Sequence, residues 1–225
     1  MNAYDGVYNR YVKRVIGFVV ALPFLAVALP MYLAIALAIV LDDGFPVLYR
    51  PYRGGYRGKK FRIFKFRTMV KNADQIGGGT TGYRDPRITR VGAFLRKTKM
   101  DETANLVNIL LGTMSFVGPR PELLQYTEKY EGAEKAILEV RPGVTDFSSL
   151  EFINLDERVG DEDPDEVYET LILKKKNELR IKYAESVSFK TDFVIFCKTV
   201  LKVLQKAFGV VFRRPFGTDS NGDLA

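Results

Sequence analysis

An uncharged stretch from Val15 to Leu41 limits the possible folds of this chain more than any other feature. As an α-helix, its 27 residues would extend roughly 40 Å, which exceeds the ~30 Å hydrocarbon core of a bilayer. A cleaved signal peptide fits poorly, because the run is too long and no small-residue cleavage site precedes a polar segment. The sequence therefore predicts contact with a membrane.

The flanks of this stretch argue against a helix that simply crosses the bilayer. Basic residues lie on both sides, at positions 10–14 and again between positions 50 and 62. A crossing helix would then break the rule that basic residues stay on one side of the membrane. Pro23 and Pro30 each remove a backbone hydrogen bond and can kink a helix. Length alone favours a spanning helix, but both features together favour a re-entrant hairpin that breaks near Pro30 and leaves at residues 42–44.

The composition excludes several kinds of chemistry. The chain has 34 basic and 27 acidic residues and no histidine, which removes histidine-dependent nucleophiles and histidine-based zinc sites. The single Cys197 excludes an internal disulfide. Carboxylates, Lys, Tyr, Ser or water must do any acid–base or nucleophilic work, and a metal would be a hard cation with oxygen ligands.

The net charge of +7 suggests phosphate-bearing partners: nucleic acid, an anionic membrane surface or a nucleotide. Residues 61–69 alternate as a half-buried strand or hairpin would, with basic and aromatic side chains interleaved. The neighbouring apolar stretch explains this charge better as attraction to a membrane surface. We therefore expect no nucleic-acid partner.

Two adjacent carboxylates, Asp101 and Glu102, follow a basic run and precede an apolar helical pattern that ends at Gly112. Asp101 is suited to cap this helix, and a helix N-terminus also favours anions. In isolation the pair is most simply an acidic first turn. However, arginines on turns rich in Pro and Gly, including Arg120 and Arg141, are suited to bidentate binding of phosphate. A carboxylate can attack phosphorus, so these features together favour phosphoryl transfer at a membrane surface.

The remaining segments predict a mostly helical α+β chain. We expect a mobile Gly-rich loop at residues 77–82 and helices at 123–139 and 160–187. Residues 189–212 form an amphipathic pattern that fits a core-packed helix and an interfacial helix equally. We divide the chain into a membrane-associated segment at 1–43, a catalytic domain at 44–212 and a disordered tail at 213–225.

Several motifs, in a single order, resemble the bacterial sugar transferase family, whose monotopic members are polyprenyl-phosphate phosphoglycosyl transferases. The resemblance extends from about residue 10 to residue 205. It rests on Lys65-Phe66-Arg67-Thr68-Met69, Asp85 to Gly92, Phe94 to Thr98, Asp101-Glu102, Asn108, Met114 to Glu122, and Arg141-Pro142-Gly143.

This resemblance implies a fold and a reaction. The fold has a re-entrant membrane helix, interfacial amphipathic helices and a small catalytic core on the cytoplasmic face of the bacterial inner membrane. The reaction transfers a phospho-sugar from a UDP-sugar to polyprenyl (undecaprenyl) phosphate, with UMP leaving, Mg²⁺ as cofactor and a covalent enzyme intermediate. It is the first membrane step in building a bacterial glycoconjugate, and a homodimer is a further expectation.

The resemblance also assigns residues. Asp101 matches the nucleophile and a Mg²⁺ contact, and Glu102 matches the second member of the dyad, which positions metal or substrate. Pro30 matches the helix-breaking proline. Positions expected near the substrate phosphates are Lys65, Arg67, Arg96, Arg120 and Arg141.

The chain departs from the family pattern at three places. Lys99-Met100 and Thr103-Ala104-Asn105 replace the usual Ser-Leu and Leu-Pro-Gln around the dyad, and Leu29 replaces the serine before Pro30. Asp146 stands where a glycine is usual. Two other functions fit the bare residues: a non-catalytic basic adaptor at the membrane surface, and a metal-dependent phosphohydrolase.

Overall fold

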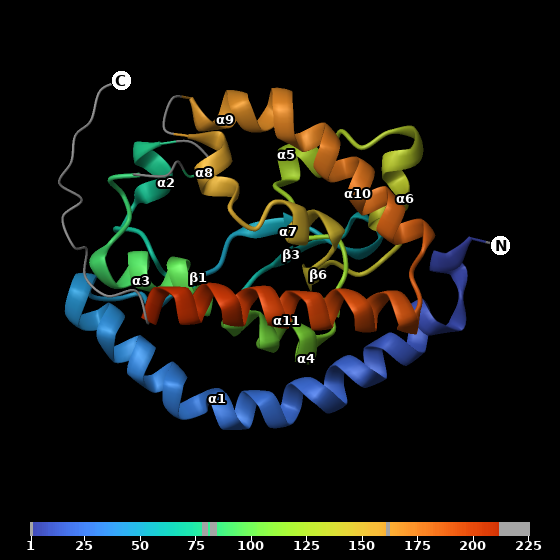
Figure 1. Ribbon diagram of the computed structural model, residues 1–225. Helices are drawn as coiled ribbons and strands as arrows, with labels where there is room; N and C mark the ends of the chain where they lie inside the picture. The colour runs from blue at the N-terminus through green and yellow to red at the C-terminus, as the bar shows by residue number, and fades with distance from the viewer. Residues whose placement is uncertain (1, 78–80, 82–84, 161–162, 212–225) are drawn as a thin grey trace, which may run out of the picture.

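The computed structural model describes residues 2–77, 81, 85–160 and 163–211. The predicted disordered tail and most of the predicted mobile Gly-rich loop lie outside the described residues. Within them the chain is mostly helical and carries three two-stranded sheets, which confirms the expected mixture of dominant helix and small sheets. Figure 1 shows a long bowed helix, α1, lying along one side of a compact body of shorter elements.

The sheets are small. In two of them the strands are antiparallel: β1 pairs with β4 and β2 with β3, whereas β5 and β6 are parallel. The strands are β1 (Leu48–Tyr49), β2 (Tyr52–Gly54), β3 (Lys60–Arg62), β4 (Lys65–Phe66), β5 (Ser115–Val117) and β6 (Gly143–Thr145). The α-helices are α1 (Lys13–Asp43), α2 (Ala73–Ile76), α3 (Arg90–Thr98), α4 (Leu106–Leu111), α5 (Leu124–Thr127), α6 (Lys135–Leu138), α7 (Phe147–Glu151), α8 (Leu155–Val159), α9 (Pro164–Val167), α10 (Leu173–Glu185) and α11 (Phe189–Val211). The 3₁₀ and π segments are η1 (Ala3–Asp5), η2 (Tyr8–Val12), η3 (Tyr56–Gly58), η4 (Met100–Asn105), η5 (Gly132–Glu134) and η6 (Tyr168–Ile172).

Helix α1 passes through both of its prolines without an interruption. It bends instead, so that its middle is farthest from the body and both ends rise towards it (Figure 1). A proline removes one hydrogen bond and crowds the preceding turn, and a bend relieves this crowding without ending the helix. The expected break near Pro30 is therefore a bend within one continuous helix, and its two arms do not lie antiparallel as in a tight hairpin.

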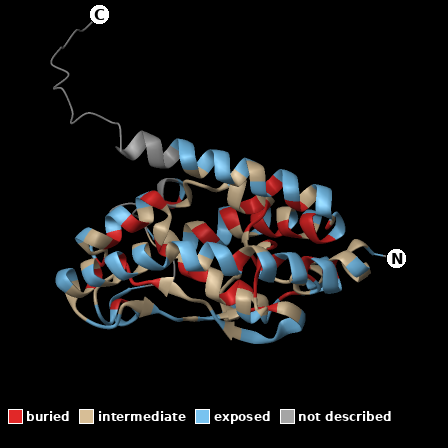
Figure 2. Ribbon diagram, turned by 90° about the horizontal axis from the view of Figure 1, so that it is seen from below, coloured by how far each residue is buried: buried red, intermediate tan, exposed pale blue. Residues whose placement is uncertain are grey.

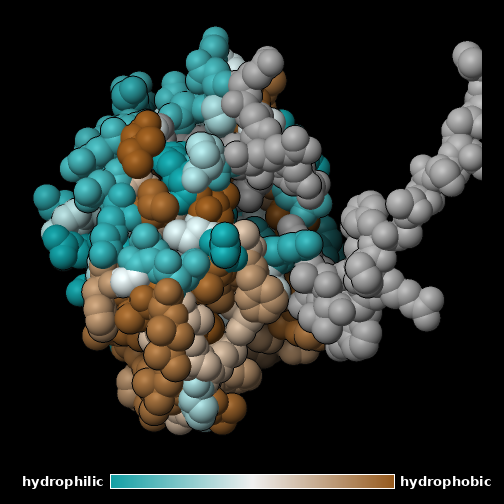
Figure 3. Space-filling model, turned by 90° about the vertical axis from the view of Figure 1, so that its left-hand side faces the viewer, coloured by the Kyte–Doolittle hydropathy of each residue, from teal (hydrophilic) through white to brown (hydrophobic). Residues whose placement is uncertain are grey.

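The outward side of α1 is apolar and exposed. Helix from Tyr8 to Asp43 contains a window of mean hydropathy 2.6, of which only 11% is buried in the protein. Val27 is 82% exposed, and Val19, Leu33 and Leu41 also exceed 60% (Figure 2). Apolar residues gather on this side of the molecule and hydrophilic residues cover the other side (Figure 3). Such a surface is suited to a lipid environment, where apolar side chains need no protein cover.

The inward side of α1 packs on the segment that carries the predicted dyad. Near its N-terminus Ala21 packs with Ile109 of α4, and near its C-terminus Ile35 and Ile39 pack with Leu95 and Ala104. The Tyr32 hydroxyl donates a hydrogen bond to the carbonyl oxygen of Thr103 at 2.6 Å. The apolar helix is thus joined directly to the turn that contains Asp101 and Glu102.

The rest of the body is organised around the parallel pair β5–β6. Val117 of β5 lies in a buried cluster with Tyr183 of α10 and Ile195 of α11. Helix α11 packs against α3 and α7, yet Phe193 and Leu201 remain 59% and 60% exposed. One side of this amphipathic helix joins the core, and another leaves apolar surface uncovered, so its interfacial role stays a prediction.

Two predicted helices differ from those observed. The predicted helix at 123–139 is divided into α5, η5 and α6, because Glu131 is extended and Gly132, the first residue of η5, adopts a positive φ of 52°. The segment after Lys99 begins as the 3₁₀ helix η4 before α4 continues to Leu111, and Gly112 ends it with φ 79° as expected. Asp101 lies inside η4 and caps no helix, so the capping prediction is wrong. Its carboxylate instead forms an ion pair with Lys65.

Candidate functional site

Asp101 is almost fully buried, with 2% of its surface exposed. Its Oδ2 atom lies 2.8 Å from Nζ of Lys65, whereas its Oδ1 atom is buried without a hydrogen-bond partner among the described residues. A buried carboxylate oxygen without a partner loses the stabilisation that water would give it. Lys65 thus holds one oxygen of Asp101 in place, and the other oxygen makes no hydrogen bond among the described residues.

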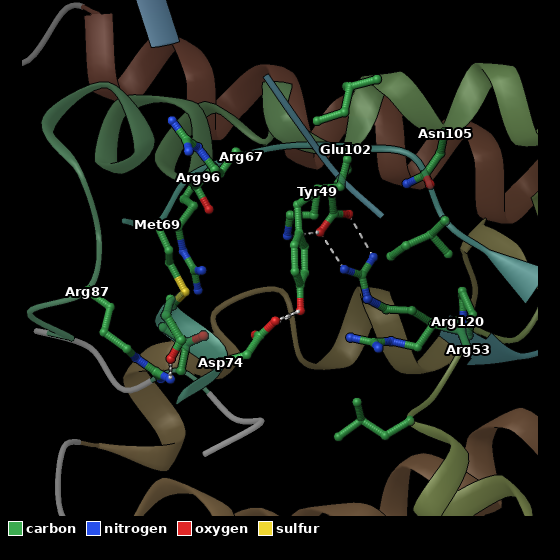
Figure 4. Close-up of a pocket in the computed structure, with 18 of the residues that line it drawn as sticks. Tyr49, Arg53, Arg67, Met69, Asp74, Arg87, Arg96, Glu102, Asn105 and Arg120 are labelled. Carbon is green, nitrogen blue, oxygen red and sulfur yellow. Dashed lines mark hydrogen bonds and ion pairs between the residues drawn. The ribbon is translucent and has the colours of Figure 1, made fainter. Parts of the chain in front are cut away.

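Glu102 forms a paired interaction with Arg120. Arg120 donates from Nη1 to Oε2 at 2.7 Å and from Nη2 to Oε1, and Nζ of Lys65 lies 3.5 Å from Oε1 (Figure 4). Burial by itself raises the pKa of Glu102, but the charges of Arg120 and Lys65 outweigh it and hold the pKa well below its usual range. The same pair raises the pKa of Arg120. Glu102 is therefore ionised throughout the physiological range.

Lys65 reaches both carboxylates because of where β4 begins. The side chain of Asn108 in α4 accepts a hydrogen bond from the backbone N–H of Phe64 at 2.8 Å and donates to the carbonyl of Arg62 at 2.8 Å. These bonds fix the link between β3 and β4 against the helix that follows the dyad. The buried Asn108 thereby sets the distance between Lys65 and Asp101.

Arg120 is positioned by two interlocked turns. A Cβ atom at Gly118 would lie 2.3 Å from the carbonyl oxygen of Arg141, and one at Gly143 would lie 2.2 Å from the amide nitrogen of Gly118. Only glycine permits this approach of the two backbones. Asp146, the departure from the family's glycine, caps α7 and accepts a bond from the amide of Arg120 at 3.4 Å. It therefore supports the turn that presents the arginine.

Two cavities meet at these residues. The first has a volume of about 760 Å³ and the second about 280 Å³. Asp101 lines the second cavity, together with apolar residues that include Leu150 of α7 and Val203 of α11. The residues that line both cavities are Lys65, Arg96, Glu102, Arg120, Leu155 and Lys176.

The first cavity collects much of the predicted phosphate-binding set. Arg96 of α3 and Arg67 line it with Lys65 and Arg120 (Figure 4). Arg67 is buried, pairs with Asp43 at 3.2 Å and holds the end of α1, but its Nη1 atom has no hydrogen-bond partner among the described residues. A buried guanidinium with an unused donor is suited to an anion.

Arg141 lies elsewhere. Its guanidinium is 4.9 Å from the centre of the Tyr56 ring and donates to the carbonyl oxygen of Asn9 at 3.2 Å. It lines neither of the two cavities. Arg141 thus joins the N-terminal helix to the body, and we leave it out of the phosphate-binding set proposed below. Pro30 also lies outside both cavities, within α1.

Sequence reasoning missed three residues of this region. Asn105 follows Glu102 by three positions, which places the two residues on one side of a 3₁₀ helix. Asn105 lines the first cavity, and its buried Oδ1 has no hydrogen-bond partner among the described residues. Lys176 lines both cavities, and Arg53 lines the first. Asn105 could have been noted from its spacing. Lys176 could not, because it sits in a run of three lysines with no distinguishing pattern.

The carboxylates at this site could bind Mg²⁺ only together with phosphate oxygens of the substrate. No group of three or more His, Cys, Asp or Glu side chains that could hold a metal occurs among the described residues. Mg²⁺ is commonly bound by one or two carboxylates together with phosphate oxygens and waters. The unpartnered Oδ1 of Asp101 and the neighbouring Glu102 meet that requirement, and all available ligands are oxygens.

Glu122, two residues after Arg120, is the centre of a buried network beside the site. It accepts hydrogen bonds from Nη2 of Arg180 at 2.8 Å and from the Tyr168 hydroxyl. Burial raises the pKa of Glu122, but Arg180 and Lys176 outweigh this effect and lower the pKa to about 2. The network ties α10 and η6 to the Arg120 turn.

This network predicts a stability loss in acid. The pKa of Glu122 is about 2 in the folded chain and 4.5 for an ordinary glutamate, so its contribution is complete above about pH 4.5. It should decrease as the pH falls from about 4.5 to about 2, by roughly 3 kcal/mol in total. Thermal unfolding in detergent, followed by circular dichroism between pH 2 and pH 6, measures this slope. The Glu122→Gln variant should lack that part of the pH dependence, and an unchanged slope would contradict the assignment.

Comparison with known proteins agrees with the arrangement of a long apolar helix beside a cluster of basic residues. The sequence matches the family described as bacterial sugar transferase over residues 8–206. This chain therefore belongs to the bacterial sugar transferase family.

Named relatives share much of this region. A UDP-glucose:undecaprenyl-phosphate glucose-1-phosphate transferase of Escherichia coli is 38% identical over 146 residues, which cover 63% of this chain and 31% of that protein. A protein of the same name from Caulobacter vibrioides is 33% identical over 195 residues, 85% of this chain and 69% of the relative. A UDP-N-acetylgalactosamine-undecaprenyl-phosphate N-acetylgalactosaminephosphotransferase of Aeromonas hydrophila is 34% identical over 146 residues, which cover 62% of this chain and 34% of that protein. The chain thus spans about a third of the E. coli and Aeromonas proteins.

Proposed function

We propose that this protein transfers a sugar phosphate from a UDP-sugar to undecaprenyl phosphate or a similar polyprenyl phosphate and releases UMP. Family membership and the names of the relatives support this reaction class. One observation carries the assignment to this site. Asp101 is buried at the meeting point of basic residues, with one oxygen bound to Lys65 and the other unpartnered.

In the first step, Asp101 attacks the phosphorus that carries the sugar. A bond forms between a carboxylate oxygen and that phosphorus, and the bond from phosphorus to the bridging oxygen breaks, so that UMP leaves with this oxygen. Lys65 orients the carboxylate through Oδ2. Arg96, Arg67 and Arg120 neutralise the negative charge of the diphosphate, which would otherwise repel the carboxylate.

In the second step, a phosphate oxygen of the acceptor attacks the same phosphorus. The bond to Asp101 breaks, the carboxylate is regenerated, and the sugar leaves on a lipid diphosphate. Glu102 is the weaker nucleophile, because each of its oxygens accepts a hydrogen bond from the positively charged Arg120, whereas one oxygen of Asp101 accepts none. We assign Glu102 to positioning Arg120 and substrate.

Asp101 and Glu102 would also hold Mg²⁺ together with donor phosphate oxygens. When bound, the cation supplies charge neutralisation at the diphosphate. Removal of divalent cations with a chelator is expected to stop UMP release.

A panel of UDP-sugars, supplied with undecaprenyl phosphate and Mg²⁺, tests the proposed reaction. We expect one or a few of them to yield UMP together with a lipid-linked sugar. Release of UDP would indicate direct glycosyl transfer and contradict this mechanism. UMP formed without lipid-linked product would indicate a phosphohydrolase. Salt-reversible binding to liposomes without nucleotide turnover would favour the adaptor.

We further infer that α1 enters and leaves the membrane on one side, with the catalytic body on the cytoplasmic face. The bow of α1, whose two ends rise towards the body, supports this topology. Its basic flanks support it also, because both would then lie on the same side. The homodimer stays a prediction.

Labelling of introduced cysteines tests the topology. In a Cys197→Ser background, Asp5→Cys and Phe45→Cys should react from the same side of sealed vesicles with a membrane-impermeant maleimide. Both positions are partly or largely exposed at the two ends of the helical segment. Glu178→Cys, on the exposed side of α10, serves as the control for the catalytic body. Opposite accessibility at residues 5 and 45 would exclude a re-entrant helix.

A further inference from the structure

Lys176 lies in the wall shared by the two cavities. It comes from α10, and only 6% of its surface is exposed. Its companions in that shared wall include Glu102 and Arg120, so its ammonium group borders the space in which phosphates would react. None of the steps described above uses it.

The ammonium group has donors to spare. It carries three N–H bonds, of which one donates to the Tyr168 hydroxyl at 2.7 Å. Its distance to Glu122 is 3.8 Å, too long for a hydrogen bond, and that carboxylate already accepts from Arg180 and Tyr168. Among the described contacts Lys176 is thus a third and weaker partner of Glu122. Nζ also lies 4.6 Å from the centre of the Tyr168 ring, so these contacts leave N–H groups of Lys176 for a further acceptor.

We propose that Lys176 is a further phosphate-binding residue, which serves both cavities and takes up a proton when a phosphate arrives. This inference rests on the proposed function, because it assigns Lys176 to the phosphates of that reaction. Facing both cavities, one ammonium group can contact the donor's phosphate in the first step and the acceptor's phosphate in the second.

Burial, together with the charges of Arg180 and Arg120, lowers the pKa of Lys176 to about 7, although Glu122 and Asp146 act in the opposite direction. Near neutral pH the group is therefore protonated in only part of the molecules. A phosphate raises the pKa of a nearby ammonium group, so binding must be coupled to proton uptake. Affinity should fall as the pH rises above about 7, because more molecules must first take up the proton.

Other charged groups near Lys176 change little over the relevant pH range. Glu102, Glu122, Arg120 and Arg180 have pKa values moved away from neutrality by their mutual pairing. Burial raises the pKa of Tyr168 above its usual value. The remaining charged groups that line the two cavities are Arg53, Lys65, Arg67, Lys71, Asp74, Arg87, Arg96, Lys99 and Asp101.

UMP binding to the purified protein in detergent, with Mg²⁺ present, tests the coupling directly. Between pH 7 and pH 8.5 the Kd of the wild type for UMP should rise about tenfold. Lys176→Arg keeps a charge that does not titrate, so its Kd should change less than about twofold. Lys176→Met should bind more weakly at pH 7 and show a similarly flat profile. Lys175→Met removes an exposed neighbour paired with Glu178 and should retain the wild-type slope.

Calorimetry gives a test that needs no variant. Titrations with UMP at pH 7.5, in buffers of different ionisation enthalpy, should reveal uptake of roughly three quarters of a proton by the wild type. A wild type without proton uptake would overturn the proposal. So would variants of Lys176 that keep the wild-type pH slope while only their thermal stability changes, since that is the behaviour of a purely structural lysine.

The turnover assay with UDP-sugars distinguishes a failure of the Lys176 proposal from a failure of the proposed function. If the wild type forms lipid-linked sugar but shows no proton uptake with UMP, Lys176 is not a phosphate-binding residue and the proposed function stands. If no UDP-sugar yields UMP, the proposed function fails whatever the pH dependence of UMP binding.

Discussion

The Asp101→Asn variant is expected to release no detectable UMP, with turnover lower than that of the wild type by at least about 10³-fold. An amide cannot form the acyl phosphate, yet its oxygen can still accept the hydrogen bond from Lys65 that holds the side chain. The fold should therefore be retained while the chemistry is lost. Incubation with the active UDP-sugar but no acceptor should add the mass of a phospho-sugar to the wild type, and intact-mass spectrometry should find none on the variant.

Asp5→Asn is a suitable control for this experiment. Asp5 forms a surface pair with Arg10 at 3.2 Å and lines neither of the two cavities, so its loss should leave turnover unchanged. Near-wild-type activity of the Asp101→Asn protein would refute the nucleophilic role. A covalent adduct on Glu102 in the wild type would refute it also.

The Arg120→Met variant should lower kcat/KM by about 10²- to 10³-fold, because a charge-stabilising donor near the phosphates is lost. Its second effect is on Glu102. With Arg120 absent, only the charges of Lys65 and Lys99 oppose the desolvation that raises the pKa of Glu102. The pKa of Glu102 should therefore increase. Activity that requires its ionised form should then begin to fall at a higher pH than in the wild type.

A pH–rate profile measures this displacement of the acidic limb. Arg120→Lys keeps a positive charge but not the two parallel hydrogen bonds, and should lie between the wild type and the Met variant in both rate and profile. Arg90→Met, at the exposed start of α3, is the control. An unchanged acidic limb in Arg120→Met would show that Glu102 is not held ionised by this arginine.

Local sequence rules predicted the apolar helix, because its signal is strong. An uncharged run longer than a bilayer core has few alternatives, and Gly112 ends its helix as a glycine with positive φ should. Lys65, Arg67, Arg96 and Arg120 were expected near substrate phosphates from the family resemblance, and the fold gathers them around the dyad.

The misses have a common cause, which is that contacts distant in sequence outweigh local preference. Asp101 was expected to cap a helix, but it is paired with Lys65, 36 residues earlier in the chain. Arg141 was expected at the phosphates; its guanidinium donates to the carbonyl oxygen of Asn9 next to the apolar helix, and its role stays a prediction. Lys176 carries no local signal, since only its burial between two cavities distinguishes it from Lys174 and Lys175.

The hydrogen bond between Tyr32 and Thr103 would fix the depth at which Asp101, the proposed nucleophile, works in a membrane. Withdrawal of an isoprenoid chain from lipid costs about 0.8 kcal/mol for each methylene exposed to water, or about 8 kcal/mol for only ten of them. A carboxylate tied to a helix that lies in the bilayer, as proposed here, meets a lipid phosphate at the headgroup level. The isoprenoid chain then does not have to leave the bilayer. The geometry of the anchor would govern access to the lipid, and bilayer thickness becomes a variable of catalysis.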